Sequence, residues 1–334
     1  MNDRSMSRRQ LLTRSALGAA GLVVGKQALN ATQEHLPVLN PGDPSLTGTK
    51  GMVTDSSIDP MAFLEHFDHG KASKLPDGRT LREYRLTVVD RDIEVAPGVR
   101  YAAWTFNSQV PGPTLRATEG DVMRIRFSNA GSHPHTAHFH GIHPANMDGV
   151  YEVVEPGQSY TYEFTAGPVG LHLYHCHAFP LKRHLAKGLY GTFIVDPKTP
   201  RPPAREMVMV MNGFDTNFDG SNETYAVNTV PFAYHSNPIP VHRGELQRLY
   251  IVNVLEFDLI NSMHLHGNFF NVFRTGAQAS TEFTDTLMFC QGERHILEFT
   301  YEDTGKFMFH AHQAEFAELG WMGVFNVTEP AVAE

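Results

Sequence analysis

The sequence has few cysteines, and Cys176 and Cys290 are the only two in 334 residues. Two thiols form at most one disulfide, so the chain cannot depend on a disulfide framework of the kind found in small secreted domains. Histidines flank Cys176 on both sides, which gives its sulfur a better use than a disulfide. Cys290 lies in an apolar stretch, and we expect it to be an inert thiol in the core.

The sequence also lacks a hydrophobic run long enough to cross a bilayer, which takes about 20 residues. The apolar stretch near the N-terminus, residues 16–24, is short and rich in Ala and Gly. Arg8 and Arg9 precede it, and a twin arginine ahead of a short apolar core is typical of an export signal. We therefore interpret residues 1–31 as a twin-arginine signal segment and expect a periplasmic or extracellular protein with no membrane partner.

Basic residues are the minority, with 27 Lys and Arg against 36 Asp and Glu. Residues 1–31 carry five basic residues and one acidic residue, a net of +4, so the formal charge of −9 for the whole chain becomes −13 without them. An acidic protein of this kind is a poor partner for nucleic acid or for an anionic lipid surface. We expect neither partner.

Glycine and proline are plentiful, at 28 and 21 residues, and they separate short runs rich in Val, Thr, Phe and Tyr. This pattern predicts an all-β protein built from Greek-key β-sandwich domains. We expect an N-terminal arm over residues 32–78, with one short helix that begins at Asp59 and Pro60. Two β domains should follow, over residues 79–197 and 205–330, with a proline-rich linker between them.

The two predicted domains contain the same motifs in the same order. Three pairs of segments correspond: residues 138–141 with 264–267, 175–177 with 310–312, and 188–193 with 320–325. The copies differ at the cysteine, which Ala311 replaces, and at Leu189, which Trp321 replaces. Asn261 stands where His135 stands in the first copy. The chain is therefore two copies of one sandwich, and only the first retains a thiol for a metal.

Four H-x-H pairs stand out, because alternate residues of a strand share one face and lie about 7 Å apart. The pairs are His138/His140, His175/His177, His264/His266 and His310/His312. Their equivalent places in the two copies are hard to explain by packing. Imidazoles without carboxylate partners favour copper over magnesium, calcium or manganese, and a zinc site would need only about four ligands.

Cys176 lies between His175 and His177, so in an extended segment its side chain points to the opposite face from theirs. One short strand can therefore serve two metal sites joined through the cysteine. A thiolate with two imidazoles and a weak or absent axial ligand is typical of a blue-copper electron-transfer site. Cys176 and His184 supply two of these ligands. Leu189, which cannot donate, stands where an axial ligand would approach, and it should raise the reduction potential.

These motifs resemble those of the multicopper oxidases, in particular the small, two-domain, laccase-like members built from two cupredoxin domains. The resemblance covers residues 80–328 and implies about four coppers per chain: one type 1, one type 2 and two type 3. It implies that His135, Cys176 and His184 hold the type 1 copper, with Leu189 in the axial position, and that His138 and His264 hold the type 2 copper. The type 3 pair would then be held by six residues: His140, His175, His177, His266, His310 and His312.

The resemblance also implies a proton relay and an assembly. Residues 147–150, Met-Asp-Gly-Val, match a family segment whose aspartate helps to move protons, so Asp148 is the candidate relay; a turn aspartate ahead of glycine is the alternative. A copper cluster with ligands from both domains needs the two sandwiches face to face. In two-domain members this occurs between neighbouring subunits of a homotrimer, although a contact within one chain would also suit the sequence.

The implied acceptor is O2, and the implied donor is a small reducing substrate. Oxidation of phenols and other aromatics, as in laccases, is expected first. A metal-ion oxidase acting on Cu(I), Fe(II) or Mn(II) is the alternative, although the 13 methionines are scattered rather than clustered as a Cu(I) site would favour. Copper nitrite reductases also resemble the chain, but they have an aspartate where His138 stands. A copper-binding protein without catalysis would give no reason to join Cys176 to a complete cluster.

Overall fold

The computed structural model describes residues 59–258, 260–277 and 279–330. The predicted signal segment and most of the predicted arm lie outside these residues. Strands dominate the described part and the helices are short, as the all-β prediction requires. None of these helices is both long and apolar enough to span a bilayer.

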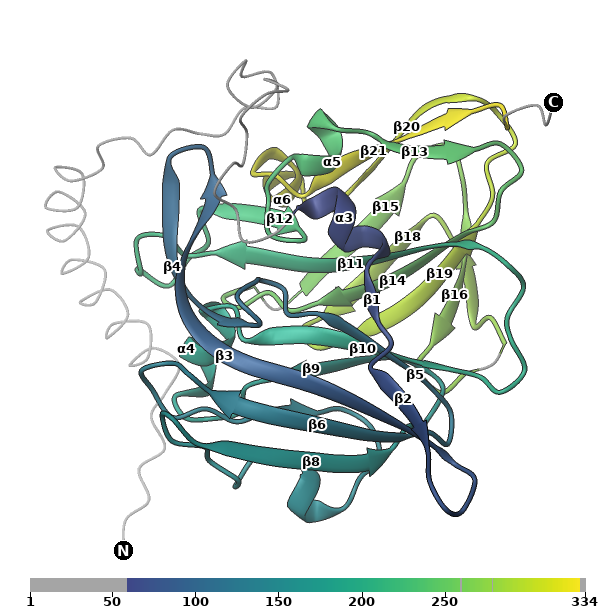
Figure 1. The fold of residues 1–334 in the computed structure, drawn as a ribbon. Coiled ribbons are helices and arrows are strands. Elements are labelled where there is room, and N and C mark those ends of the chain that lie inside the picture. The colour runs from purple at the N-terminus through teal and green to yellow at the C-terminus, as the bar shows by residue number, and fades with distance from the viewer. Residues whose placement is uncertain (1–58, 259, 278, 331–334) are drawn as a thin grey trace, which may run out of the picture. The chain divides into compact units, whose positions relative to one another are not determined.

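Two sheets form the first sandwich (Figure 1). The outer sheet contains β2 (Lys71–Lys74), β3 (Thr80–Ala96), β4 (Val99–Phe106), β6 (Val122–Asn129) and β8 (Ser159–Thr165). The inner sheet has the order β1 (Phe67–Asp68), β5 (Thr114–Thr118), β10 (Tyr190–Asp196), β9 (Gly170–His175) and β7 (His138–Phe139). The 3₁₀ turn η1 (Ala145–Met147) and the helix α4 (Leu181–Ala186) lie in its connections.

Two further sheets form the second sandwich. One has the order β12 (Thr224–Val227), β11 (Arg205–Phe214), β14 (Gln247–Asn253), β19 (Arg294–Phe299), β16 (Phe270–Arg274) and β17 (Glu282–Thr284). The other has the order β13 (Ile239–His242), β21 (Met322–Thr328), β20 (Gly305–His310), β15 (Ile260–Leu265) and β18 (Thr286–Cys290). Two short helices, α5 (Ala233–Ser236) and α6 (Ala314–Glu318), complete it. Each sheet contains both parallel and antiparallel strand pairs. Two β-sandwiches of this kind confirm the predicted fold class, although the predicted domain boundaries stay predictions.

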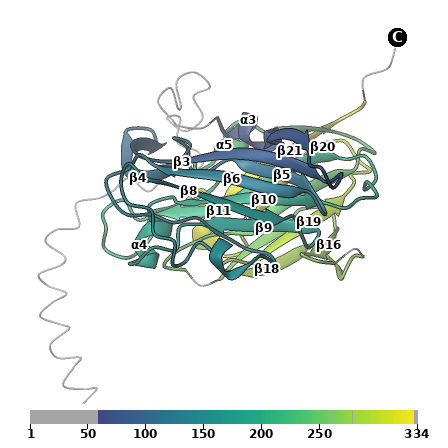
Figure 2. The same cartoon turned by 60° about the horizontal axis from the view of Figure 1, so that its bottom comes forward.

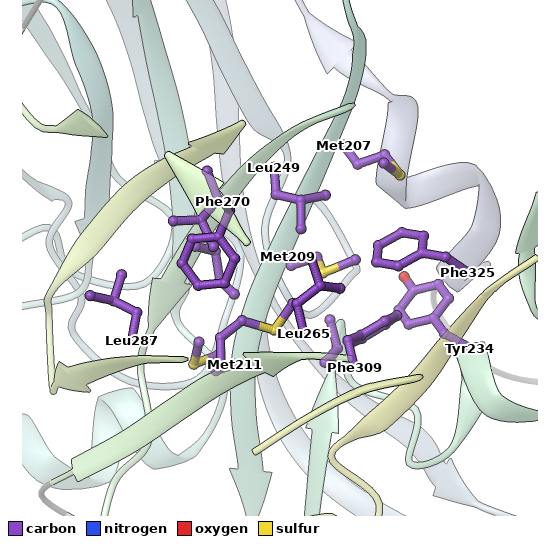
Figure 3. Close-up of a cluster of buried hydrophobic side chains, with 14 of the residues drawn as sticks. Met207, Met209, Met211, Tyr234, Leu249, Leu265, Phe270, Leu287, Phe309 and Phe325 are labelled. Atoms are coloured by element: carbon purple, nitrogen blue, oxygen red, sulfur yellow. The ribbon is translucent and has the colours of Figure 1, made fainter. Parts of the chain in front are cut away.

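Each sandwich has its own apolar core, because alternate residues of its strands face inward. In the second sandwich Met207, Met209 and Met211 of β11 pack against aromatic and aliphatic side chains of both sheets. Figure 3 shows this cluster, with Phe309 and Phe325 beside Tyr234. The unbranched methionines fill irregular gaps between the rings.

A third core joins the two sandwiches. The intervening residues of β11, Val208 and Val210, point away from the methionines and pack with Leu171 and Leu173 of β9. Both faces of β11 are therefore buried, which explains its continuous apolar sequence. The inner sheet of the first sandwich thus lies against the β11-containing sheet of the second, and Figure 1 shows β9 and β10 between β6 and β11.

Part of the predicted arm belongs to the sheets. The expected helix is confirmed as α3 (Pro60–Glu65), and the Asp59 carboxylate caps it by accepting the Met61 N–H at 2.9 Å. Leu64 lies in the second core, while Phe63 lies in the core between the sandwiches. β1 pairs with β5 and β2 pairs with β3. The arm is thus a structural element of both sandwiches over its described residues.

The interpretation of Cys290 as a core thiol is wrong. Cys290 is exposed at the end of β18, whereas the neighbouring Phe289 is fully buried. Alternate residues of a strand face opposite sides, so the apolar stretch buries Leu287 and Phe289 and leaves Met288 and Cys290 outside.

Candidate metal centres

Cys176 follows the last residue of β9 and lies in a buried group with His135 and His184. Cys176 Sγ is 3.2 Å from His184 Nδ1 and 3.8 Å from His135 Nδ1, and the two Nδ1 atoms are 3.2 Å apart. Three donor atoms therefore meet at one point. The structure thus brings together the three residues that the sequence assigned to a blue-copper site.

The backbone around this group holds each donor in place. The Cys176 N–H donates to the Leu189 carbonyl at 2.9 Å, and the Leu189 N–H donates to the His184 carbonyl at 3.3 Å. The Thr136 N–H donates to Cys176 Sγ at 3.4 Å, a contact that stabilises a thiolate. Leu189 is fully buried beside the cysteine backbone, as an axial hydrocarbon would be.

The electrostatics of this group suit a cation. Burial and the neighbouring His184 lower the pKa of His135 to about 4. Burial, together with the charges of His133 and Arg183, also lowers the pKa of His184 to about 4. Both imidazoles are therefore neutral near pH 7, as metal ligands must be. Burial raises the pKa of the Cys176 thiol, because a buried thiolate is poorly solvated. A cation bound between the three donor atoms would offset this effect by placing a positive charge beside the thiolate.

A second group of histidines lies on the other side of the same strand end. His138, His140 and His175 converge, with His140 Nε2 and His175 Nε2 only 3.2 Å apart. The His177 ring lies 5.5 Å from that of His138, measured between ring centroids. β7 and β9 place these side chains because His138 pairs directly with His175. The cysteine thus faces one group while the histidine before it belongs to the other, as the sequence predicts.

The second sandwich repeats this arrangement. His264, His266 and His310 converge, and His266 Nε2 is 2.9 Å from His310 Nε2. The centroid distances are 5.4 Å for His264–His310 and 5.4 Å for His264–His312, against 5.2 Å and 5.5 Å for the equivalent pairs of the first sandwich. We call the four histidines of the first sandwich half-site 1 and those of the second half-site 2. No ring contact joins a histidine of half-site 1 to one of half-site 2 within the described residues.

Backbone carbonyls orient the rings in both half-sites. The carbonyl oxygens of Asp148 and Cys176 lie 2.7 Å from His138 Nδ1 and 2.9 Å from His175 Nδ1. In half-site 2 the carbonyl of Asp285 lies 3.0 Å from His264 Nδ1, and that of Ala311 lies 2.7 Å from His310 Nδ1. A carbonyl only accepts, so each Nδ1 carries the proton and each Nε2 lone pair is left free. The four Nε2 lone pairs are thus available to a cation, and imidazole nitrogens suit copper, so the residues fit copper.

The aspartate predicted as a proton relay lies beside half-site 1. Asp148 Oδ1 is 3.1 Å from His138 Nδ1 and 3.7 Å from His143 Nε2. Asp148 follows η1 and precedes Gly149, whose φ is +71°. A Cβ at Gly149 would lie 2.0 Å from the Ala137 carbonyl oxygen, next to His138, so this close approach requires glycine. The turn reading and the relay reading of Asp148 are both compatible with this geometry.

Several residues that position these histidines were not predicted from the sequence. Asp285 is the counterpart of Asp148, and Thr286 Oγ1 lies 2.8 Å from His264 Nδ1. The His177 N–H donates to Thr136 Oγ1 at 2.8 Å, and the His312 N–H donates to Ser262 Oγ at 2.7 Å. Thr136 and Ser262 occupy corresponding positions two residues ahead of an H-x-H pair, which is the signal that would have found them.

Comparison with known proteins agrees with this geometry. Residues 87–200 and 200–331 match two protein-family models, each described as a multicopper oxidase. A solved multicopper oxidase is 56% identical, with a TM-score of 0.80 over 82% of this chain and 98% of its own. The chain therefore belongs to the multicopper oxidase family, whose members are copper oxidoreductases.

More distant relatives include copper-containing nitrite reductases and a laccase. The copper-containing nitrite reductase of Neisseria meningitidis (strain Z2491) is 28% identical over 249 residues, which is 68% of this chain and 64% of that protein. This chain therefore spans somewhat less than two thirds of that relative. Laccase-1 of Cryptococcus neoformans var. grubii is 27% identical over 196 residues, covering 55% of this chain and 30% of the laccase.

Proposed function

We propose that the protein is a laccase-like oxidase that couples one-electron oxidation of a small aromatic reductant to the reduction of O2 to water. One observation carries the proposal: Cys176 contacts His135 and His184, while His175, joined to it by a peptide bond, belongs to half-site 1. Two groups of metal ligands are thus covalently connected. A protein that only stored copper would not need this connection.

We assign the type 1 site to His135, Cys176 and His184, with Leu189 as a non-ligating axial neighbour. His138 and His264 are assigned to a type 2 copper. His140, His175, His177, His266, His310 and His312 are assigned to a type 3 pair. When bound, about four coppers per chain would supply one-electron redox chemistry at the cysteine and four-electron reduction of O2 at the histidines.

We infer that two copies of the chain complete the shared site. Half-sites 1 and 2 form separate groups within the described residues, and each holds only half of the eight histidines. Exposed apolar side chains flank both: Ile142 and Phe179, at 77% and 84% exposure, follow histidines of half-site 1, and Phe269, at 47%, follows half-site 2. Such apolar surface next to an incomplete site favours contact with another copy. We propose a homotrimer in which half-site 1 of one subunit meets half-site 2 of the next.

Protons are the second requirement of O2 reduction. Asp148 Oδ1 lies within hydrogen-bond distance of His138 Nδ1, at 3.1 Å, and the Asp148 residue is partly exposed. Its carboxylate therefore connects solvent to half-site 1. We assign Asp148 to proton delivery, with His143 Nε2, 3.7 Å away, as its neighbour on the other side.

An assay of metal content and of acceptor use tests the proposal. We expect about four coppers per chain, an intense blue absorption, and O2 uptake with phenols. Fe(II), Cu(I) and Mn(II) are assayed in parallel, because a preference for one of them would identify the metal-ion oxidase alternative. Nitrite consumption without O2 uptake would contradict the proposal and favour the nitrite reductases. Export by the twin-arginine route stays a prediction, since Arg8 and Arg9 lie outside the described residues.

Substitution of the cysteine tests the connection itself. Cys176→Ser should remove the blue absorption and O2 uptake while the histidine sites still bind copper, because serine is a far weaker copper ligand than a thiolate. Cys290→Ser, at the exposed end of β18, is the matched control and should change neither. Retention of the blue colour in Cys176→Ser would place the type 1 site elsewhere.

A further inference from the structure

The axial side of the type 1 group is formed by one residue in a short turn. Leu189 is fully buried in the same core as Cys176. It lies between Gly188, whose φ is +107°, and Tyr190, the first residue of β10. The axial neighbour tunes the reduction potential of a copper of this type, and a hydrocarbon keeps donor atoms away only while it stays in place. The contacts that fix Gly188 and Tyr190 therefore also fix the axial side.

Tyr190 is held by a side chain of the second sandwich. Asn212 of β11 is 1% exposed, and its amide Nδ2 donates to the Tyr190 hydroxyl at 2.9 Å. The Tyr190 ring belongs to the core between the sandwiches, and Figure 2 shows β9, β10 and β11 together at this junction. The ring cannot move away without breaking a hydrogen bond between two buried groups, which is costly because water does not replace the lost partner.

Gly188 is held through the same asparagine. A Cβ at Gly188 would lie 2.6 Å from Val110 Cγ2, so the Val110 side chain packs closely on the backbone just before Leu189. The Val110 carbonyl accepts the hydroxyl of Thr229. Thr229 also pairs twice with Asn212, since its N–H donates to Asn212 Oδ1 at 3.1 Å and its Oγ1 accepts from Asn212 Nδ2 at 3.1 Å. Asn212 and Thr229 thus hold the residues on both sides of Leu189.

Thr229 adopts an unfavourable backbone conformation to make these contacts. Its φ is +79°, in the left-handed region that a β-branched residue rarely adopts, and the residue is fully buried. Strain of this kind persists only where the surrounding structure enforces it, and it gathers at functional sites. Glycine would suit this conformation better, but it has no hydroxyl to donate to Val110.

The first sandwich has a copy of this segment that does not make the same contact. Residues 107–111, Asn-Ser-Gln-Val-Pro, resemble residues 228–231, Asn-Thr-Val-Pro. Asn107 and Ser108 are also left-handed, with φ of +53° and +64°. Ser108 is partly exposed, however, whereas Thr229 is fully buried and binds the opposite sandwich. The sandwich without a thiol for copper therefore supports the sandwich that has one.

We propose that Asn212 and Thr229 are positioning residues that fix Leu189 in the axial position, so that the second sandwich sets the reduction potential of a copper bound only by the first. This proposal rests on the proposed function, because it requires a type 1 copper at Cys176. Without these contacts residues 188–190 can shift, and a water or a main-chain oxygen can approach the axial side. The cupric state then gains a donor, and the potential falls.

Redox titration of the copper-loaded protein against a one-electron mediator tests the proposal without turnover. Thr229→Val keeps the shape of the side chain and removes its hydroxyl, and Asn212→Ala removes the bonds to Tyr190 and Thr229. In each variant the equilibrium constant for electron exchange should move about tenfold towards the cupric form, a fall of about 59 mV for a one-electron couple. The blue absorption should shift in wavelength. Thr229→Ser, which retains the hydroxyl, should behave like the wild type.

Asn253→Ala is the matched control for Asn212→Ala. Asn253 is also fully buried in the second sandwich, and its side chain binds main-chain groups of that sandwich: Nδ2 donates to the Phe289 carbonyl at 3.3 Å and Oδ1 accepts the Leu255 N–H at 3.1 Å. Thermal unfolding of the copper-free proteins should show a loss of stability in both variants. The potential should change in Asn212→Ala alone.

An unchanged potential in both Thr229→Val and Asn212→Ala would overturn the proposal, because a purely structural role lowers stability and leaves the potential as it was. An equal shift in Asn253→Ala would also overturn it. If Asn212→Ala does not fold, the comparison of Thr229→Val with Thr229→Ser decides. A wild-type protein without blue absorption would instead contradict the proposed function, and the use of O2 or phenols does not enter the measurement.

Discussion

At the scale of single residues, four of the eight half-site histidines are oriented before any metal binds. The Nδ1 atoms of these four lie beside main-chain carbonyls, which a substitution of a side chain cannot remove. The Nε2 lone pairs are therefore directed by the fold itself. Binding of copper should need little rearrangement of half-site 1 or half-site 2, since the rings are already in place.

Asp148 gives a prediction at this scale. Asp148→Asn keeps the size of the side chain and its backbone carbonyl but removes the carboxylate that can hold a proton. We expect the turnover number for O2 uptake to fall about 100-fold, the usual loss for a proton-transfer group. Anaerobic reduction of the type 1 site should be unchanged. Asp285→Asn, at the corresponding place in the second sandwich, is the control, because the Asp285 carboxylate lies farther from its histidine, at 4.0 Å. Equal losses in both variants would contradict a relay specific to Asp148.

At the scale of elements, the short helix α3 joins the sandwiches. Phe63 is 5% exposed in the core that they share. Phe63→Ala should lower the free energy of unfolding by about 3 kcal/mol, because it leaves a cavity that β strands cannot collapse to fill. Calorimetry of the copper-loaded protein measures this. Glu65→Ala on the same helix breaks only an exposed pair with Arg205 and should cost less than about 1 kcal/mol. A similar loss in both variants would mean that α3 acts through charge and not through packing.

The linker between β10 and β11 is held at both ends by Arg116. Its guanidinium binds Asp196 at 2.7 Å and Glu206 at 2.6 Å. Burial raises the pKa of Glu206, but hydrogen bonds from Arg116, Tyr250 and Arg248 outweigh it and lower that pKa from 4.5 to about 2. Because the folded pKa is the lower one, this stabilisation is present above about pH 4.5 and is lost as the pH falls towards 2.

Acid unfolding of a Glu206→Gln variant tests this linkage. The variant should be less stable at pH 7 by about 2 kcal/mol, since it leaves Arg116 and Arg248 short of a partner in a part-buried place. The difference from the wild type should shrink as the pH falls from 4.5 towards 2. Unfolding is followed by circular dichroism on the copper-free protein, so that loss of metal in acid does not contribute. A difference that stays constant over this range would show that Glu206 acts by shape alone.

The elements also show what the sequence could predict. The strand pattern, the H-x-H repeat and the helix start at Asp59 and Pro60 are local signals, and the all-β fold and α3 were predicted closely for that reason. The pairing of β1 with β5 and β2 with β3 was not predicted, because sheet register joins residues far apart in the sequence. The contact of the Trp104 ring with His135 and His184 was not predicted for the same reason: nothing in the stretch around Trp104 indicates that β4 lies against the end of α4. The burial of Cys290 was predicted wrongly because an apolar stretch does not reveal which face of the strand is buried.

At the scale of the whole molecule, assembly and copper content should be coupled. Ile142 is 77% exposed and follows His140 of half-site 1. Ile142→Asp would place a charge in the proposed contact between copies, and we expect the trimer to dissociate. Copper should then fall from about four to about one per chain, because the type 1 site lies within one sandwich whereas the other ligands are shared.

Light scattering and metal analysis on the same samples measure this coupling. Phe218→Asp is the control, because Phe218 is 61% exposed but lies beside α4, away from both half-sites. It should leave assembly and copper content unchanged. A monomeric Ile142→Asp variant that keeps its full copper content would show that the shared site forms within one chain.

The placement of the two half-sites as separate groups also limits how copies can associate. A contact that joins unlike surfaces either closes into a ring or continues without end. In a ring every surface is satisfied, so complete sites and subunits are equal in number. An open chain of subunits always leaves one unmatched half-site at each end. It therefore binds fewer coppers per subunit than a closed ring, and the difference becomes smaller as the chain of subunits becomes longer. The number of coppers per subunit therefore distinguishes a closed ring from an open chain of subunits.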